Sequence, residues 1–218
     1  MTAKPATEPR ASLYLPPQFQ VRDLQACTAL MRAHPLAMLV SVREGAPFVS
    51  HCPLQVDRDG ERLTLLGHLA RANPHWRTLA GGVEALAIFR GPDAYMSPGV
   101  YPDRQRVPTW SYVAVHASGP VHLVDDEAGK ERLLKALIAE HEPAYAAQWD
   151  EIAADFGRRL LAGIVGFEID VQRLEGKFKL NQHRPEAHAA MLAAYGSGSA
   201  AERELADWMR RLGIDGGG

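Results

Sequence analysis

The spacing of apolar residues divides the chain into helical stretches and short runs of strand type. Apolar residues three and four positions apart predict a helix over residues 23–33, with Asp23 at its start and Pro35 beyond its end. Short apolar runs bounded by glycine, proline and charged turns predict strands. These strands are expected at residues 36–42, 47–54, 63–68, 85–89, 111–117, 119–124 and 163–171. Further helices are expected at residues 76–79, 126–141, 144–161, 185–195 and 200–212.

Six or seven short strands joined by tight turns favour an antiparallel barrel over a sheet of βαβ units. The sequence therefore predicts an α+β fold, mostly β, with peripheral and C-terminal helices. We expect a flexible tail at residues 1–12, the barrel domain at residues 13–184, and a helical extension packed on the same domain at residues 185–218. The run from Gly196 to Ser199 is expected to be a hinge between the last two helices.

The charge balance excludes one class of function and leaves most others open. The 218 residues contain 24 Lys and Arg against 26 Asp and Glu, a net charge of −2. A chain that binds nucleic acid without sequence preference usually has a basic surplus, so the chain as a whole does not fit that class. A local basic patch is still compatible with this balance.

The sequence shows no feature of a membrane protein or a secreted one. No apolar stretch reaches 18 residues, and residues 1–10 lack the apolar core of a signal peptide. The two cysteines, Cys27 and Cys52, are too few to staple a domain of this size, so we expect free thiols. Together these observations predict a cytoplasmic protein with no membrane partner.

The common catalytic and nucleotide-binding motifs are absent. The sequence has no GxGxxG, GxxxxGK[ST], GxSxG or HExxH. A Rossmann dinucleotide site, a P-loop, a hydrolase nucleophile elbow and a zinc protease site are therefore not expected. His183 and His188 are five residues apart with Pro185 between them, so we interpret both as solvent-exposed imidazoles rather than metal ligands.

A first candidate segment is rich in proline and aromatic residues. Residues 91–101 and 107–116 together contain three prolines, three tyrosines and a tryptophan. Prolines stiffen the backbone, and aromatic rings offer flat surfaces with polar edges. This composition suits a planar ligand or the surface of a partner subunit. It is also typical of a packed loop that closes one end of a barrel.

Two further segments are rich in hydrogen-bond donors. Residues 67–76 place His68, Arg71 and Asn73 between a strand and the start of a helix, a combination that suits a phosphate group. A solvated arginine and an asparagine helix cap explain it equally well. Residues 176–185 contain two lysines, an arginine, a histidine and two amides. They could hold an anion or the polar edge of a heteroaromatic ring, or form a solvated basic turn.

Taken in order, these segments resemble the PaiB family, the FMN-binding negative transcriptional regulators. The residues that carry the resemblance are Tyr14–Phe19, His68–Pro74, Pro108–Tyr112 with Val115 and His116, and Gly176–Gln182. It runs from about residue 13 to residue 195, which is most of the chain. The sequence departs from the family pattern at Val100, where Trp is usual, and at Ser111, where Asn is usual. In the closing motif, Asn181 and His183 stand where Ser and Asn are usual.

The resemblance implies an antiparallel FMN-binding split β-barrel, a homodimer, and FMN sites at the interface between two subunits. It also implies a flavoprotein that acts as a transcriptional regulator, a repressor, with operator DNA as a possible partner. The residues themselves give no helix-turn-helix pattern.

With FMN as the ligand, we expect Arg71, assisted by His68 and Asn73, to hold the phosphate group. Ser50 and His51 are expected to flank the isoalloxazine ring.

Trp110, which follows Thr109, is expected to contribute to the ring site from across the interface. We also expect Lys179 and Gln182 to reach the ligand, although they point the same way only if a helical turn bridges them. The alternative for this turn is that it closes the dimer interface or contacts DNA phosphates.

Three other functions stay open at this point. A flavin-dependent oxidoreductase could be built on the same barrel, since a fold does not dictate a function. A haem-binding or haem-degrading split barrel would use His51, His68 or His116 as an axial ligand. A structural dimer without a ligand is the third. The absorbance spectrum of the purified protein separates flavin, haem and no cofactor.

Overall fold

The computed structural model describes residues 12–103 and 105–215. The tail expected at residues 1–12 therefore lies outside the described residues, except for Ser12. The helices are α1 (Leu24–Ala33), α2 (His75–Leu79), α3 (Glu127–His141), α4 (Ala146–Asp150), α5 (Ala154–Ala162), α6 (His188–Gly196) and α7 (Ala200–Arg211). The strands are β1 (Gln20–Val21), β2 (Leu36–Arg43), β3 (Ala46–Pro53), β4 (Gln55–Asp59), β5 (Arg62–Ala70), β6 (Glu84–Met96), β7 (Thr109–Val124), β8 (Ile164–Asp170) and β9 (Arg173–Lys179). Short 3-10 turns are η1 (Pro17–Phe19), η2 (Pro98–Val100), η3 (Pro143–Tyr145) and η4 (Pro185–Ala187).

All strand pairs in the described residues are antiparallel. The strand order is β3-β2-β6-β7-β8-β5-β4, and β9 pairs with both β7 and β1. The hydrogen-bonded path is open, because β3 and β4 form its two ends. The α+β class and the antiparallel sheet predicted from the sequence are thereby confirmed, as a split and open sheet rather than a closed ring.

β7 is one continuous strand, so the prediction of two strands, at residues 111–117 and 119–124, was wrong. Residues 112–118 pair with β9, and residues 121–124 pair with β8 on the same edge. The N–H of Val121 donates to the carbonyl of Val83, next to β6. The backbone nitrogen of residue 120 therefore points to the other edge of β7, at the gap between β9 and β8. Pro120 lacks an N–H but needs none there, and the strand continues through it.

β9 was not predicted, because its residues were interpreted as part of a basic turn after the last strand. The sequence of β9 is RLEGKFK, in which charged and apolar or small residues alternate. Gly176 and Phe178 are buried, while Lys179 is half-buried on the other face. The period of two is the strand signal, and the charged half of it concealed the pattern.

The helix expected at residues 144–161 is broken into η3, α4 and α5. The break lies at residues 151–153, where Ala153 takes extended backbone with φ −54° and ψ 131°. β6 continues seven residues beyond the strand expected at residues 85–89, through Met96, so the first part of the segment rich in proline and aromatic residues is strand. The other expected helices and strands are present with shifts of a few residues at their ends.

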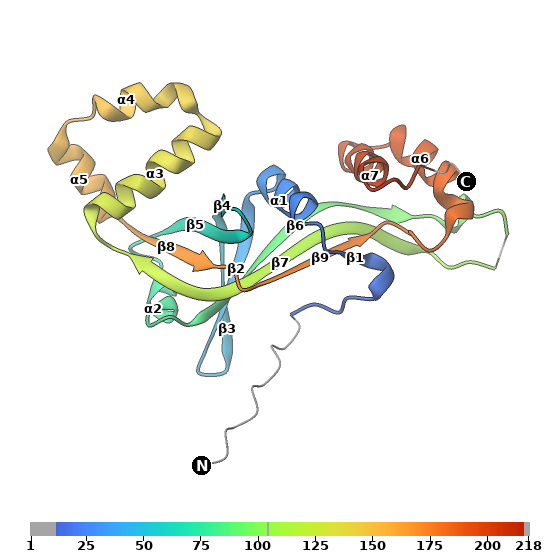
Figure 1. Ribbon diagram of the computed structural model, residues 1–218, viewed down its shortest axis with the longest axis horizontal. Coiled ribbons are helices and arrows are strands. Elements are labelled where there is room, and N and C mark those ends of the chain that lie inside the picture. The colour runs from blue at the N-terminus through green and yellow to red at the C-terminus, as the bar shows by residue number, and fades with distance from the viewer. Residues whose placement is uncertain (1–11, 104, 216–218) are drawn as a thin grey trace, which may run out of the picture.

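One face of the long sheet is covered by helices. Figure 1 shows α1, α6 and α7 on the same side of β6 and β7, with α3, α4 and α5 at the opposite end of the molecule. Helix α7 packs on β6, and the Trp208 and Phe178 rings meet edge to face at 5.1 Å between centroids. Phe89, Val113 and Val115 are fully buried beneath these helices. This covered face is the hydrophobic core.

The two cysteines lie in this core as free thiols. Burial raises the pKa of Cys27 to about 11 and the pKa of Cys52 to about 12. Thiolates therefore form poorly at neutral pH, and neither cysteine is a candidate nucleophile.

The opposite face of β3, β2, β6 and β7 carries apolar side chains that none of the helices in the described residues covers, and we call it the bare face. Its residues alternate with the buried ones along each strand. They include Leu36, Met38, Val40 and Val42 on β2, Val49 and His51 on β3, Leu86 and Ile88 on β6, and Trp110, Tyr112 and Ala114 on β7. Leu36 is 64% exposed and Val42 60% exposed. Such a face is usually polar when it meets water.

Candidate functional site

The site residues expected from the sequence fall into two groups, and the first lies where β3 and the end of β5 meet α2. Asn73 Nδ2 donates to Ser50 Oγ at 3.0 Å, and Ser50 Oγ lies 2.8 Å from His75 Nδ1. His75 Nε2 lies 3.0 Å from Ser41 Oγ, which is 2.7 Å from Thr78 Oγ1. This buried hydrogen-bonded chain joins β2, β3 and α2.

The two ends of this chain constrain the directions of its bonds. The Asn73 amide nitrogen can only donate, so Ser50 accepts from it, and we assign the Ser50 proton to His75 Nδ1, the other partner of this hydroxyl in the described residues. His75 Nε2–H then donates to Ser41, Ser41 donates to Thr78, and Thr78 donates to the His75 carbonyl at 2.8 Å. His75 is therefore neutral, and burial lowers its pKa. Sequence reasoning did not single out His75, although it follows the Asn73-Pro74 pair directly.

Arg71 is held by a carboxylate far away in the sequence. Its guanidinium donates to both oxygens of Asp125, with Nη1 to Oδ2 at 2.9 Å, and Nη2 also donates to the Ile164 carbonyl at 3.1 Å. Lys130 Nζ joins the same carboxylate at 3.2 Å. The Arg71 bond, with help from Lys130, lowers the pKa of Asp125 to about 2. A phosphate group that takes both terminal nitrogens of this guanidinium in a bidentate pair would have to displace Asp125.

Ser50 and His51 do not point to the same side of the sheet. Ser50 is buried and belongs to the His75 chain, whereas His51 is exposed on the bare face. Adjacent strand residues alternate between faces, so one chain cannot flank a single ring with both. His68 is half-buried on β5, and burial lowers its pKa.

The second group lies at the start of β7 and the end of β9. Lys179 Nζ donates to Thr109 Oγ1 at 2.5 Å and to the Trp110 carbonyl at 2.7 Å. Trp110 Nε1 donates to Asp93 Oδ1 at 2.8 Å, and its ring stays 49% exposed. No carboxylate pairs with Lys179 in the part of the chain that the structure describes. The structure thus brings Thr109, Trp110 and Lys179 together.

Gln182 is turned onto its own backbone. Its Oε1 accepts from the Leu180 N–H at 3.0 Å, and its Nε2 donates to the Phe178 carbonyl. Asn181 has a φ of +63°, so no helical turn bridges Lys179 and Gln182 and the condition for their pointing the same way fails. The amide of Gln182 closes this turn instead of facing a ligand.

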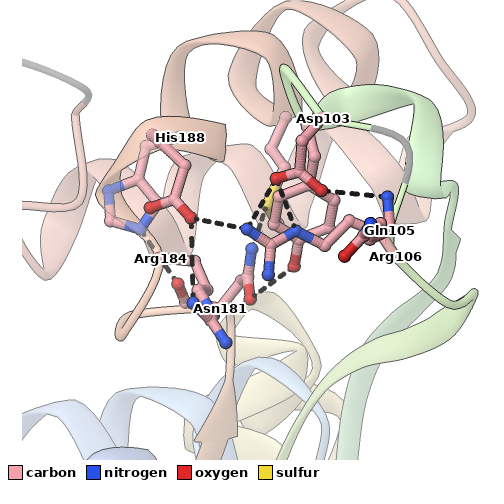
Figure 2. Close-up of polar contacts among 9 residues, drawn as sticks. Asp103, Gln105, Arg106, Asn181, Arg184 and His188 are labelled. Atoms are coloured by element: carbon pink, nitrogen blue, oxygen red, sulfur yellow. Dashed lines mark hydrogen bonds and ion pairs between the residues drawn. The ribbon is translucent and has the colours of Figure 1, made fainter.

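The turn is fixed from several sides (Figure 2). Tyr101 donates to Asn181 Oδ1 at 3.1 Å, and the Asn181 carbonyl lies 3.0 Å from His188 Nε2. His188 is buried, with 7% of its surface exposed, so the interpretation of His188 as a solvent-exposed imidazole was wrong. His183 is exposed, as expected. The His188 contact depends on the bend at Asn181, which the spacing of the two histidines does not predict.

The two groups are too far apart to meet on one ligand within a single chain. Strand pairing aligns His51 with Met38, Met38 with Ile88, and Ile88 with His116, three strands away. Trp110 lies six residues farther along β7. With about 4.8 Å between strands and about 3.4 Å per residue, His51 and Trp110 are about 25 Å apart.

Two hollows adjoin Trp110. The sheet hollow, of about 290 Å³, lies on the bare face among Met38, Ile88, Arg90 and Tyr112. The second, which we call the strand-end pocket, has about 400 Å³ and lies between the ends of β7 and β9 and residues 105–107. Trp110 lines both.

Comparison with known proteins supplies a family and a fold. The family model described as "Putative FMN-binding domain" matches residues 13–173. The protease synthase and sporulation protein PAI 2 of Bacillus subtilis is 31% identical over 175 residues, covering 80% of this chain and 84% of that protein. No helix in the described residues is long and apolar enough to cross a bilayer.

Solved structures of similar fold bind flavins according to their names. An FAD- and haem-binding protein of Mycobacterium smegmatis has a TM-score of 0.58 at 20% identity, covering 74% of this chain and 73% of that one. The flavocytochrome Anf3 of Azotobacter vinelandii has the same TM-score at 18% identity, covering 73% of this chain and 69% of that one. These similarities support the fold, an antiparallel split barrel of the flavin-binding type.

Proposed function

The chain belongs to the PaiB family of FMN-binding domains, and from this premise we propose that it is an FMN-binding regulator that works as a homodimer. FMN is the cofactor that the family model names. The relative from Bacillus subtilis is named as a protein of protease synthesis and sporulation, which supports a regulatory role rather than a metabolic one.

The observation that carries the dimer is the bare face. Leu36, Val42 and Trp110 are between 49% and 64% exposed on a sheet whose other face is already covered by helices. Contiguous apolar surfaces of this kind mark interaction sites in soluble proteins. We assign the face to a second copy of the same chain, because the residues proposed to contact the flavin lie about 25 Å apart within one chain.

The residues of the bare face fit a flavin ring. Met38, Ile88 and Tyr112 give the sheet hollow an apolar floor, and in the proposed dimer the partner subunit's Trp110, exposed on its own bare face, covers it. Arg90 and Asp93 border the same hollow and supply polar groups for the edge of the ring. When bound, FMN supplies a ring that can accept and return electrons.

In the proposed dimer, Trp110 and Thr109 of one subunit approach the partner's ring site, next to His51. The FMN phosphate lies at the Arg71 corner, near His68 and Asn73, and takes the place of the Asp125 carboxylate on the guanidinium. Ser50 supports this corner through the His75 chain rather than touching the ring.

A spectrum and a mass test the cofactor and the dimer. The full chain, loaded with FMN and desalted, is expected to show flavin absorbance. Light scattering is expected to give twice the 23.9 kDa of one chain. A monomer at micromolar concentration would rule out the proposed dimer. Loss of all FMN on desalting would rule out the proposed cofactor site.

DNA binding tests the regulatory role separately. Fluorescence anisotropy with fragments from upstream of its own gene is expected to show binding that changes when FMN is added. If no fragment binds with or without FMN, and the FMN-loaded protein oxidises NAD(P)H, the proposed regulator is wrong and a flavin-dependent oxidoreductase takes its place as the explanation.

A further inference from the structure

The strand-end pocket has an unusual charge. Arg106, Lys179 and Arg184 line it together with His183, and no Asp or Glu among the described residues does. A cavity of about 400 Å³ lies at the small end of the range for ligand sites. Cations without acidic neighbours in the lining favour an anionic occupant.

Two carboxylates outside the lining offset part of this charge. Arg106 pairs with Asp103 at 2.7 Å and with Glu186 at 3.4 Å, and Figure 2 shows its guanidinium between Asp103 and the Asn181 turn. Arg184 reaches the same Glu186 at 4.0 Å. Arg106 and Arg184 thus share two carboxylates, and the charge of Lys179 is left over.

Lys179 is the cation that has no ionic partner. Its ammonium contacts only neutral oxygens, the hydroxyl of Thr109 and the carbonyl of Trp110. Burial, with the neighbouring Lys177, lowers the pKa of Lys179, as expected for an ammonium whose charge no carboxylate in the described residues compensates. An anion in the pocket would do so.

The walls of the pocket are aromatic and fixed. Tyr101 and Phe19 line it together with Trp110. Arg106 stacks over the Tyr101 ring at 4.7 Å, and Tyr101 is tied to Asn181 by its hydroxyl. Rings held in this way present flat surfaces at little cost in conformational entropy.

We propose that the strand-end pocket binds a small aromatic anion, with its carboxylate or phosphate group on Lys179 and Arg184 and its ring against Tyr101. The pocket is lined by one chain, and it shares Thr109 and Trp110 with the residues proposed to approach the partner's flavin. The inference goes beyond the proposed function, and it requires the anion and FMN to bind at the same time.

Calorimetric titration of the full chain with simple probes tests this site. Phenyl phosphate and benzoate each combine a ring with an anion, inorganic phosphate lacks the ring, and benzyl alcohol lacks the charge. Phenyl phosphate or benzoate is expected to bind about tenfold or more tightly than inorganic phosphate and benzyl alcohol do. The same difference is expected in the presence and absence of saturating FMN. Comparing phenyl phosphate with benzoate identifies the preferred anion.

Variants locate the binding. Lys179→Gln keeps a hydrogen-bond donor to Thr109 and is expected to weaken binding of the preferred probe about tenfold or more. Arg184→Gln, at a half-exposed position, is a second test that leaves the Lys179 contacts intact. Lys135→Gln on α3, far from the pocket lining, is the matched control and should bind as the wild type does.

Equal binding by wild type and both pocket variants would overturn the inference. Displacement of the probe by FMN would also overturn it, since the pocket would then belong to the flavin. A chain that binds the probe but not FMN would contradict the proposed function and leave this site standing.

Discussion

At the scale of single residues, His75 joins three elements through one neutral imidazole. Both ring nitrogens are engaged, one with Ser50 on β3 and one with Ser41 on β2, and the ring also packs against Phe48 at 4.7 Å between centroids. A second proton on this ring would meet the Ser50 hydroxyl, whose own hydrogen already points there.

The pKa shifts give the folded protein an acid-sensitive stability. Burial lowers the pKa of His75, His68 and His116 below the ordinary 6.5. Below about pH 6.5 the unfolded chain therefore takes up protons that the folded chain does not. The free energy of unfolding is expected to be highest above this pH and to fall as the pH drops below it.

Urea denaturation at pH 7.5 and pH 5.5 measures this effect. His75→Gln is expected to cost about 2–4 kcal/mol at pH 7.5, because buried hydroxyls lose a partner, and to flatten the pH dependence. An unfolding free energy that stays constant between the two pH values, or rises at pH 5.5, would contradict the assignment of a neutral His75.

Arg71 and Asp125 make a second prediction at this scale. If FMN phosphate replaces Asp125, Arg71→Ala is expected to weaken FMN binding by about 1.5–3 kcal/mol. Asp125→Asn is expected to strengthen it, since the competing negative charge is gone. Quenching of flavin fluorescence gives both dissociation constants. An unchanged constant in Arg71→Ala would leave the pair a purely structural link between β5 and the start of α3.

At the scale of elements, the sequence predicts hairpins better than it predicts long strands. The β2–β3 hairpin follows from two apolar runs around Glu44-Gly45, and both turn residues have positive φ, 53° and 81°. In β7 the Gly119-Pro120 pair is a break by composition, yet the strand passes through it, because the pairing partner changes at that point. Local composition does not reveal a change of partner.

Lys177 explains why β9 escaped prediction. This charged residue is only 7% exposed within the sheet, where its ammonium donates to the Tyr14 carbonyl at 2.7 Å and lies 5.1 Å from the Tyr14 ring. The compensation comes from a segment more than 160 positions earlier in the chain. No short sequence window contains it.

For the candidate site, as for the strands, the sequence predicts the notable residues but not their distant partners. Composition indicated Arg71, Asn73 and Lys179 as chemically notable, and the structure gives each of them a defined set of partners. The partners themselves decide the roles, and Asp125 lies 54 residues from Arg71. Long-range pairing of this kind is a property of the fold, and a single sequence does not display it.

Gly119 gives an element-scale prediction. A Cβ at this position would lie 1.8 Å from the carbonyl oxygen of Asp170, the last residue of β8 before the turn to β9. Gly119→Ala is therefore expected to destabilise the protein by about 1–3 kcal/mol. Gly157→Ala in α5 is the matched control, since its Cβ meets nothing closer than 3.8 Å, and a small gain in stability is expected there.

Thermal unfolding of the two glycine variants provides the comparison. Equal stability of Gly119→Ala and the wild type would show that the β8–β9 turn can move away from β7. That result would remove the close approach as the reason for glycine at this position.

At the scale of the whole molecule, the two faces of the sheet differ in what covers them. Helices α1, α6 and α7 cover one face and bury the core (Figure 1), and the bare face is the one that we propose binds a second copy and the flavin. Leu36→Asp places a charge on the bare face at a residue that is 64% exposed, so the single chain should still fold. It is expected to shift the protein to monomers and to weaken FMN binding about tenfold or more.

Phe156→Asp on α5 is the control for this variant, because Phe156 is 48% exposed and lies off the sheet. Light scattering and flavin titration are expected to give wild-type values for it. A Leu36→Asp protein that stays dimeric would move the interface away from the bare face.

The continuity of β7 has a consequence for how the molecule unfolds. One edge of this 16-residue strand bonds to β6, and the other bonds first to β9 and then to β8. The two halves of the sheet therefore share one backbone, and neither can open without breaking ladders of the other. Hydrogen exchange at the central amides of β7 should require global unfolding, so that a barrel split in its architecture behaves as one cooperative unit.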